Sequence, residues 1–309
     1  MTKMPAIKGG SMNTSIFDKQ EKAAKPFRNQ ITPAQNAVNW VLMVLVFLTM
    51  VLPMLNVLAI SLSSNAASQV ADVTLWPRDF STEGYTMIWR ARNLGQAFVN
   101  SSFVSVVGTV ISVTISAMAG YVLIQRDLPF RKTIATGILI TMMIPGDLTL
   151  VSIFSLNKSL GLIDSYLGLI LNGLVSAFSI MLMRNYFLSV PESLAESARI
   201  DNASEMRIFF SIYLPLSLPG LAAITFLDFI GKWNSFMIPL IITTKPQLYT
   251  LPIILRQLTQ PTDSTSGVEQ IYDNARMAAI VITVLPLLGV YSFAQRFLIG
   301  GLTLGAAKG

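Results

Sequence analysis

Cysteine and histidine are both absent from the 309 residues of this chain. Without cysteine the protein can form neither a disulfide nor a thiolate metal site, and without histidine a zinc site or a Ser-His triad lacks its usual parts. No Gly-x-x-x-x-Gly-Lys-Ser/Thr loop is present either, because Gly231-Lys232 lacks the first glycine and is followed by Trp233. We therefore predict no catalytic residue, no metal site and no nucleotide bound by this chain itself.

Charged residues are also scarce. They make up 12% of the chain, whereas a soluble domain has about one quarter. Hydrophobic residues make up 52%, and the mean hydropathy is +0.59. This composition indicates a protein embedded in a lipid bilayer.

Six apolar runs are each near or above the roughly 20 residues that a helix needs to cross a bilayer. They lie at about 38–62, 98–124, 133–157, 165–188, 220–243 and 277–300. Some of these runs contain proline, which is compatible with a membrane-spanning helix. A proline leaves a backbone carbonyl without its helical hydrogen bond, and neighbouring helices can supply a partner. The sequence therefore predicts an all-α membrane protein. It has a six-span domain at 38–300, an N-terminal tail at 1–37 and a C-terminal tail at 301–309.

The net charge of +6 is concentrated beside the first apolar run. The chain before Trp40 carries six basic and two acidic residues, a balance of +4. This placement fits the positive-inside rule and attraction to anionic lipid heads, and it does not indicate nucleic acid as a partner. With an even number of spans, both termini are predicted to be cytoplasmic.

A polar stretch at 189–219 separates the fourth and fifth runs on the same predicted side, yet its net charge is −2. We expect Ser189 to cap a helix that has Pro191 in its first turn. Leu194, Ala195 and Ala198 then share one face at helical spacing.

A second short helix is expected to follow a break at Asn202, since asparagine tolerates a left-handed turn. Ser204 caps it, and Pro215 and Pro219 end it. Two such amphipathic helices make a knob that fits a groove on another protein. The alternative is a loop helix lying in the membrane interface.

The same stretch resembles the cytoplasmic loop of ABC-importer permeases, written Glu-Ala-Ala, three residues, Gly, nine residues, Ile-x-Leu-Pro. Here Glu196-Ser197-Ala198, Asn202 and Ile212-Tyr213-Leu214-Pro215 occupy those positions with the full spacing, and Ser197 and Asn202 depart from the usual residues. Trp233-Asn234-x-Phe236 and Gln295-Arg296-Phe297 resemble motifs of the carbohydrate branch. The chain is thus similar to LplC-type permeases and, more distantly, to the smaller permease of the maltose importer.

This resemblance implies the type I ABC importer permease fold, with six transmembrane helices and a cytoplasmic coupling-helix loop, in the cytoplasmic membrane of a bacterium. It implies half of a heterodimeric pore made with a second homologous permease. Two copies of a cytoplasmic ATPase, which hold the ATP and Mg, and an extracytoplasmic solute-binding protein complete the importer, whose substrate is an oligosaccharide. The implied ATPase-coupling residues are Glu192, Glu196, Ser197, Ala198, Arg199, Asp201 and Asn202, and the ATPase-facing tail residues are Lys308 and Gly309.

Charged residues inside the apolar runs are candidates for the translocation path, because charges in a bilayer are costly. Asp147 follows Pro145-Gly146, where the third helix is expected to be interrupted. Asp228 and Lys232 lie four apart on one helix face, either as an internal salt bridge or beside the path. In the second case, Trp233 stacks on a sugar ring and Asn234 bonds its hydroxyls. A narrower prediction is an acidic oligosaccharide such as an alginate fragment, with Lys232 as its cationic contact.

Two other functions remain open from the sequence. One is a six-span secondary transporter or channel that works without ATP, for which inverted repeats would be the sign. The other is a membrane-anchored scaffold for a cytoplasmic complex.

Overall fold

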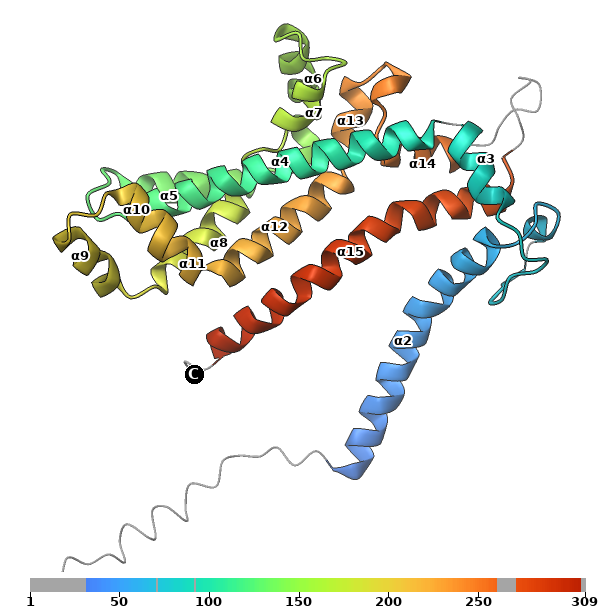
Figure 1. Cartoon of the computed structure of the whole chain (residues 1–309), viewed down its shortest axis with the longest axis horizontal. Coiled ribbons are helices and arrows are strands. Elements are labelled where there is room, and N and C mark those ends of the chain that lie inside the picture. The colour runs from blue at the N-terminus through green and yellow to red at the C-terminus, as the bar shows by residue number, and fades with distance from the viewer. Residues whose placement is uncertain (1–31, 71, 92, 260–270, 307–309) are drawn as a thin grey trace, which may run out of the picture. The chain divides into compact units, whose positions relative to one another are not determined.

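The computed structural model describes residues 32–70, 72–91, 93–259 and 271–306, and within these ranges the regular structure is helical (Figure 1). One isolated bridge joins Ser63 and Phe80. The chain divides into two units, residues 1–53 and 54–309. The described part of the first unit belongs to helix α2, and the sites below all lie in the second.

Helix α2 runs from Pro33 to Ser61 and begins ahead of the predicted residue 38. A capping box explains its start. Thr32 N–H donates to Gln35 Oε1 at 3.0 Å, and Gln35 N–H donates to Thr32 Oγ1 at 3.3 Å, which satisfies two N–H groups that have no partner inside the helix. Pro33 follows the cap, where a missing N–H costs nothing.

Helix α4, Leu94–Val122, lies along α8, Ala177–Leu188, and α12, Leu218–Trp233 (Figure 1). Small residues make this close packing possible, because they let helix backbones approach each other. A Cβ added at Gly120 would lie 2.9 Å from the backbone nitrogen of Arg184 on α8. The buried small residues of α4 that repeat at helical spacing are Ser101, Ser105, Gly108, Ser112, Ser116 and Gly120.

The third, fourth and fifth apolar runs form broken helices. The third contains α5, Arg131–Thr141, a 3₁₀ turn, Gly146–Thr149, and α6, Leu150–Ser159. The fourth contains α7, Tyr166–Leu171, and α8, and the fifth contains α12 and α13, Met237–Ile242. The interruption expected at Pro145-Gly146 is confirmed. The runs at 165–188 and 220–243 are also each divided into two helices.

Local chemistry explains the break in the fourth run. Gly173 has φ +78°, a conformation that ends a helix, and the side chain of Ser176 then accepts the N–H of Ser179 at 3.1 Å to begin α8. Within the described residues, three single helices are long and apolar enough to cross a membrane: Pro33–Ser61, Leu94–Val122 and Asp273–Arg296. The pair Glu205–Leu216 and Leu218–Trp233, bent by 82°, passes the same test together.

The last helix, α15, is Asp273–Ala306 and continues past the predicted end of its span at residue 300. The other remaining helices and turns are short. They are α3, Glu83–Ala91; α9, Glu192–Ile200; α10, Glu205–Ile208; the π-helical turn Phe209–Tyr213; α11, Leu214–Leu216; α14, Leu251–Thr259; and the 3₁₀ turns Ala67–Gln69 and Pro246–Leu248.

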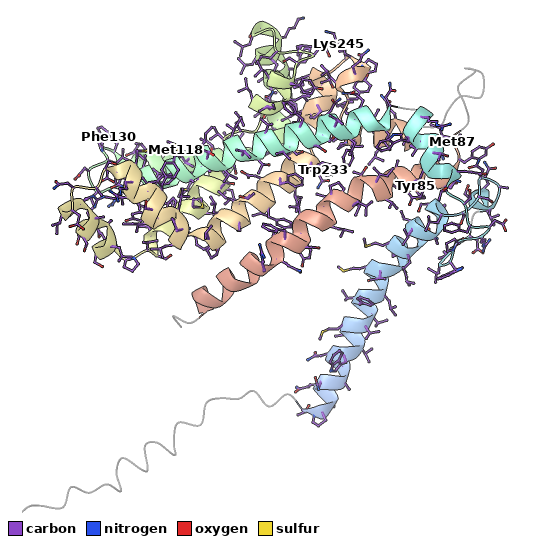
Figure 2. The ribbon with its side chains drawn as sticks, viewed as in Figure 1. Tyr85, Met87, Met118, Phe130, Trp233 and Lys245 are labelled. Atoms are coloured by element: carbon purple, nitrogen blue, oxygen red, sulfur yellow. The ribbon has the colours of Figure 1, made fainter. Side chains whose placement is uncertain are left out.

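Two aromatic clusters lie in the packed bundle. In the first, Trp233 lies among residues of α3, α4, α12, α14 and α15 (Figure 2). Its ring stacks on that of Phe229, with centroids 5.7 Å apart, and meets the edge of Phe98 at 5.9 Å. In the second, Tyr121 near the end of α4 packs against Phe187 of α8 and against residues of the 189–219 stretch. This second cluster forms the base on which the polar stretch sits.

Candidate functional site

Helix α9 begins at Glu192, directly after Pro191, and Ser189 does not cap it. The Ser189 hydroxyl donates to the Tyr186 carbonyl at 2.6 Å and the residue adopts φ −81°, ψ −13°, so it ends α8. The predicted cap was therefore wrong, because α8 continues up to Leu188 and the serine adopts the backbone conformation of that helix.

The buried face of α9 differs from the predicted one. Ala195 is fully buried and Ala198 is half-buried, but Leu194 is 44% exposed and Ile200 is 81% exposed. Successive helical residues point about 100° apart, so Leu194 cannot share the direction of Ala195. Two alanines thus hold α9 against the bundle, whereas Ile200 faces outward and Leu194 is exposed at the edge of the contact.

The turn after α9 forms as expected. Asn202 has φ +55°, and Ser204 accepts the N–H of Arg207 at 3.4 Å as the cap of α10. Pro215 does not end the second helix. It lies in the first turn of α11, which needs no N–H at that position, and the chain turns by 82° after Leu216.

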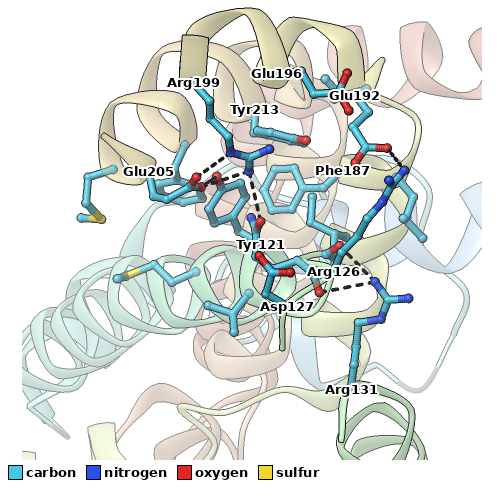
Figure 3. A pocket seen from close by; sticks show the side chains of 18 residues that line it. Tyr121, Arg126, Asp127, Arg131, Phe187, Glu192, Glu196, Arg199, Glu205 and Tyr213 are labelled. Carbon is cyan, nitrogen blue, oxygen red and sulfur yellow. Dashed lines mark hydrogen bonds and ion pairs between the residues drawn. The ribbon is translucent and has the colours of Figure 1, made fainter. Parts of the chain in front are cut away.

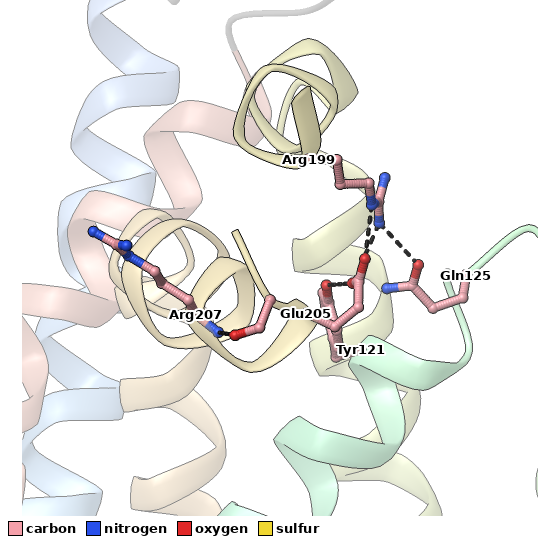
Figure 4. A network of polar contacts seen from close by, with 6 residues as sticks. Tyr121, Gln125, Arg199, Glu205 and Arg207 are labelled. Carbon is pink, nitrogen blue, oxygen red and sulfur yellow. Dashed lines mark hydrogen bonds and ion pairs between the residues drawn. The ribbon is translucent and has the colours of Figure 1, made fainter. Parts of the chain in front are cut away.

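A polar network ties α9 and α10 to the end of α4 (Figure 4). Arg199 donates to Glu205 at 2.7 and 3.3 Å and to Gln125 Oε1 at 3.2 Å, and the Tyr121 hydroxyl donates to Glu205 at 2.5 Å. The hydrogen bond from Arg199 and then the one from Tyr121 lower the pKa of Glu205. Glu205 therefore remains ionised and links three segments of the chain.

A cavity of about 1000 Å³ opens beside this network, between the ends of α4 and α8 and the helices α9 and α10 (Figure 3). An Arg126–Glu192 ion pair crosses it, and Arg131 also borders it. Glu196 lies at the same cavity and is exposed, and among the described residues it has no hydrogen bond or ion pair. One face of α9 therefore carries an unpaired carboxylate next to the exposed side chain of Ile200.

A second, smaller cavity of about 370 Å³ lies between α4, the α7–α8 connection, α12 and α13. Lys232 and Asp228 both line it, but they do not form an ion pair. Asp228 accepts the hydroxyls of Ser112 at 2.7 Å and Ser179 at 2.8 Å, whereas Lys232 donates to the Gly173 carbonyl at 2.7 Å. The salt-bridge alternative was wrong, because partners on neighbouring segments draw the two side chains apart.

Trp233 has no face open to a sugar. Its ring is 1% exposed within the core, and its indole N–H donates to the Thr283 carbonyl at 3.1 Å. The predicted stacking role was therefore wrong, since packing against α15 buries the ring. Asn234 is exposed just after the end of α12, and Asp147 lies in the turn Gly146–Thr149.

Residues 112–303 match the family of binding-protein-dependent transport system inner membrane components. The chain belongs to this family. It is 33% identical over 267 residues to the polygalacturonan/rhamnogalacturonan transport system permease protein YtcP of Bacillus subtilis, covering 84% of this chain and 93% of that protein. It is 30% identical over 266 residues to Protein LplC of the same organism, covering 84% and 90%.

A crystal structure of a bacterial ABC transporter involved in the import of the acidic polysaccharide alginate contains a chain with the same fold. The TM-score is 0.78 with 27% sequence identity, covering 88% of this permease and 99% of that chain. The predicted family, an ABC-importer permease of the carbohydrate branch, and the predicted all-α permease fold are both confirmed. The permease is an inner membrane protein.

The structure places all seven predicted coupling residues of the permease on one helix and its C-terminal turn. These are Glu192, Glu196, Ser197, Ala198, Arg199, Asp201 and Asn202. Lys308 and Gly309 lie outside the described residues, so their predicted role stays a prediction.

Sequence reasoning missed the contacts of the 189–219 stretch with Tyr121, Gln125 and Arg126, and the part that Glu205 plays in them. One signal was available, because Tyr121 and Gln125 are four residues apart at the end of a long apolar run and so face the same direction. The acceptor of the Tyr121 hydroxyl, Glu205, is 84 positions along the chain, and no local pattern connects the two.

Proposed function

We propose that the permease is the membrane subunit of an ABC importer for oligosaccharides, and that α9 is the element that a separate ATPase subunit grips. The observation that carries this proposal is the outer face of α9. It combines the unpaired carboxylate of Glu196 with the side chain of Ile200, which is 81% exposed and one helical turn away on the same face. Exposed apolar side chains beside a fixed charge are what a docking surface for another protein offers.

The complete importer needs further subunits. A second homologous permease supplies the other half of the pore, two copies of a cytoplasmic ATPase hold ATP and Mg, and an extracytoplasmic solute-binding protein delivers the sugar. The family description names binding-protein-dependent transport, which supports the last partner. The excess of basic residues beside the first apolar run supports a cytoplasmic position for both termini. The permease itself performs transport without catalysing a reaction.

The narrower proposal is an acidic oligosaccharide, such as an alginate fragment. The name of the relative YtcP includes polygalacturonan and rhamnogalacturonan, and the crystal structure with the same fold is of a transporter involved in alginate import. Both names refer to polymers that contain acidic sugars. A cationic side chain inside the membrane domain, Lys232, is consistent with such a substrate.

The mechanism is alternating access. ATP binding closes the two ATPase subunits, and because α9 is bound in one of them, it moves as a rigid element. Contacts of Arg199 and Glu205 with the end of α4 then pass this movement to the membrane helices. Rigid-body shifts of packed helices are a common way to open a site to one side. The sugar changes the balance between the two states only by binding them with different affinity.

Charge reversal on α9 tests the proposal. Glu196→Lys is expected to release the ATPase during co-purification and to abolish ATP-driven uptake, while the permease still folds, because Glu196 is exposed and has no partner among the described residues. Asp127→Lys makes the same reversal at another exposed acidic residue beside the cavity, but outside α9, and is the control. Uptake that continues without any ATPase would instead favour a secondary transporter or channel. ATPase binding without uptake would favour a scaffold.

A further inference from the structure

Some hydrogen-bond donors in the walls of the smaller cavity have no acceptor among the described residues. An ammonium group has three N–H donors, and Lys232 uses one of them on the Gly173 carbonyl. Ser105 and Thr250, which are 1% and 5% exposed, both line the cavity. Their hydroxyl oxygens are buried and have no hydrogen-bond partner among the described residues. Two buried hydroxyls and a lysine therefore remain available to a ligand.

The carboxylate and amide oxygens in the same walls are already engaged. Each carboxylate oxygen of Asp228 receives a serine hydroxyl, at 2.7 and 2.8 Å. The side-chain oxygen of Asn172 receives the amide of Asn157 at 3.2 Å, and its own amide donates to the Gly168 carbonyl at 2.6 Å. A group that enters the cavity thus meets unused N–H and O–H donors. The matching ligand is rich in acceptor oxygens and carries negative charge.

The lysine is held in place by the packing around it. A Cβ added at Gly108 of α4 would lie 2.9 Å from Lys232 Cδ, so the glycine makes room for the stem of the side chain. Gly173, with φ +78°, lies in the turn that presents its carbonyl to the ammonium. Because both glycines fix where the ammonium lies, the site is formed before a ligand arrives, which lowers the entropy cost of binding.

We propose that this cavity is a subsite for one acidic sugar residue of the transported oligosaccharide. The sugar carboxylate lies against the Lys232 ammonium, and the Ser105 and Thr250 hydroxyls bond its oxygen atoms. A volume of about 370 Å³ falls within the roughly 300–1,000 Å³ of small-molecule sites. A carboxylate fits better than a neutral hydroxyl because Lys232 is bonded, among the described residues, only to a neutral carbonyl, while the nearby Asp228 carboxylate is held by two serine hydroxyls. A hydrogen bond between two charged groups is stronger than one to a neutral group. This inference rests on the proposed import function.

The test compares two substrates in the complete importer, reconstituted in vesicles with its ATPases and binding protein. One substrate is a uronic-acid trisaccharide, and the other is the same trisaccharide with its carboxyl groups reduced to alcohols. Lys232→Met is expected to lower uptake of the acidic sugar by about tenfold relative to the neutral one, the size expected for loss of one charged hydrogen bond. Lys158→Met, at an exposed lysine outside the cavity, is the control and should leave this ratio unchanged.

Two smaller changes keep the test independent of folding defects. Ser105→Ala and Thr250→Val remove only the unpartnered hydroxyls and should each lower the acidic-to-neutral uptake ratio about two- to fivefold. Equal losses for both sugars in Lys232→Met, or an unchanged ratio in all three variants, would overturn the subsite while leaving the import function standing. A wild-type complex that imports neither trisaccharide, or that imports them without ATP, would overturn the import function and the subsite with it.

Discussion

Removing the Tyr121 hydroxyl should weaken the connection between α9 and α4 without changing the outer surface of α9. In Tyr121→Phe, Glu205 loses the 2.5 Å hydrogen bond but keeps its ion pair with Arg199. The phenyl ring stays in the aromatic cluster, where its centroid is 5.1 Å from that of Phe209. The substitution therefore isolates one polar contact between two segments.

The size of the effect follows from the exposure of the acceptor. A hydrogen bond to a charged group contributes about 1.5–3 kcal/mol when its loss leaves a buried group unpaired. The Glu205 side chain is 53% exposed, so water replaces much of what is lost. We therefore expect Tyr121→Phe to lower the free energy of the contact between α9 and α4 by about 1 kcal/mol. This corresponds to roughly a fivefold change in the equilibrium between the attached and detached states of α9.

The assay is the amount of sugar imported per ATP hydrolysed by the reconstituted complex. Tyr121→Phe is expected to lower this ratio by about fivefold while the ATPase still co-purifies, because the outer face of α9 is intact. Tyr213→Phe is the matched control: its ring is 5.0 Å from that of Tyr121, and its hydroxyl has no hydrogen bond to the described residues. Equal ratios in both variants and in the wild type would refute the reasoning.

Three other predictions follow from the same packing. Ionised Glu205 stabilises the loop fully at a pH above the ordinary glutamate pKa of about 4.3. Because the pKa of Glu205 is lowered in the folded state, this stability is lost as the pH falls through that lowered pKa. Glu205→Gln should therefore make the unfolding temperature depend less on pH on the acid side of a thermal-unfolding profile. Ser112→Ala leaves one Asp228 oxygen without its hydroxyl donor and should cost about 1–3 kcal/mol in unfolding free energy, whereas Ser116→Ala, whose hydroxyl has no partner among the described residues, should cost little. Gly120→Ala places a Cβ 2.9 Å from a backbone nitrogen of α8 and should lower the unfolding free energy by about 1–3 kcal/mol, measured in detergent; no loss would contradict the close approach of α4 and α8.

Hydropathy, charge placement and motif spacing are enough to identify the family and the all-α class. These signals are local. A run of apolar residues marks a potential span by itself, and Asn202 and Ser204 determine their turn and cap through their own side chains and backbone. The same reasoning failed at Ser189, because whether a serine begins one helix or ends the previous one depends on how far the previous helix continues.

The partners inside the bundle depend on segments far apart in the sequence. Asp228 and Lys232 are four residues apart on α12, which by itself suggests an ion pair. Their observed partners are Ser112, Ser179 and Gly173, which α4, α8 and the α7–α8 connection bring to α12. A hydrogen bond forms with whichever group the packed backbone brings within about 3 Å, and sequence spacing specifies that only within one helix.

The sequence by itself determined that this chain is a membrane permease with a polar stretch at 189–219, because composition, periodicity and motif spacing are properties of the chain in one dimension. Tertiary structure decided that Ala195 rather than Leu194 faces the bundle, that Trp233 is core, and that Lys232 and two unpartnered hydroxyls share a cavity. The physical reason is that burial and pairing depend on which surfaces meet when helices pack, and small residues along α4 set how closely α8 and α12 can approach.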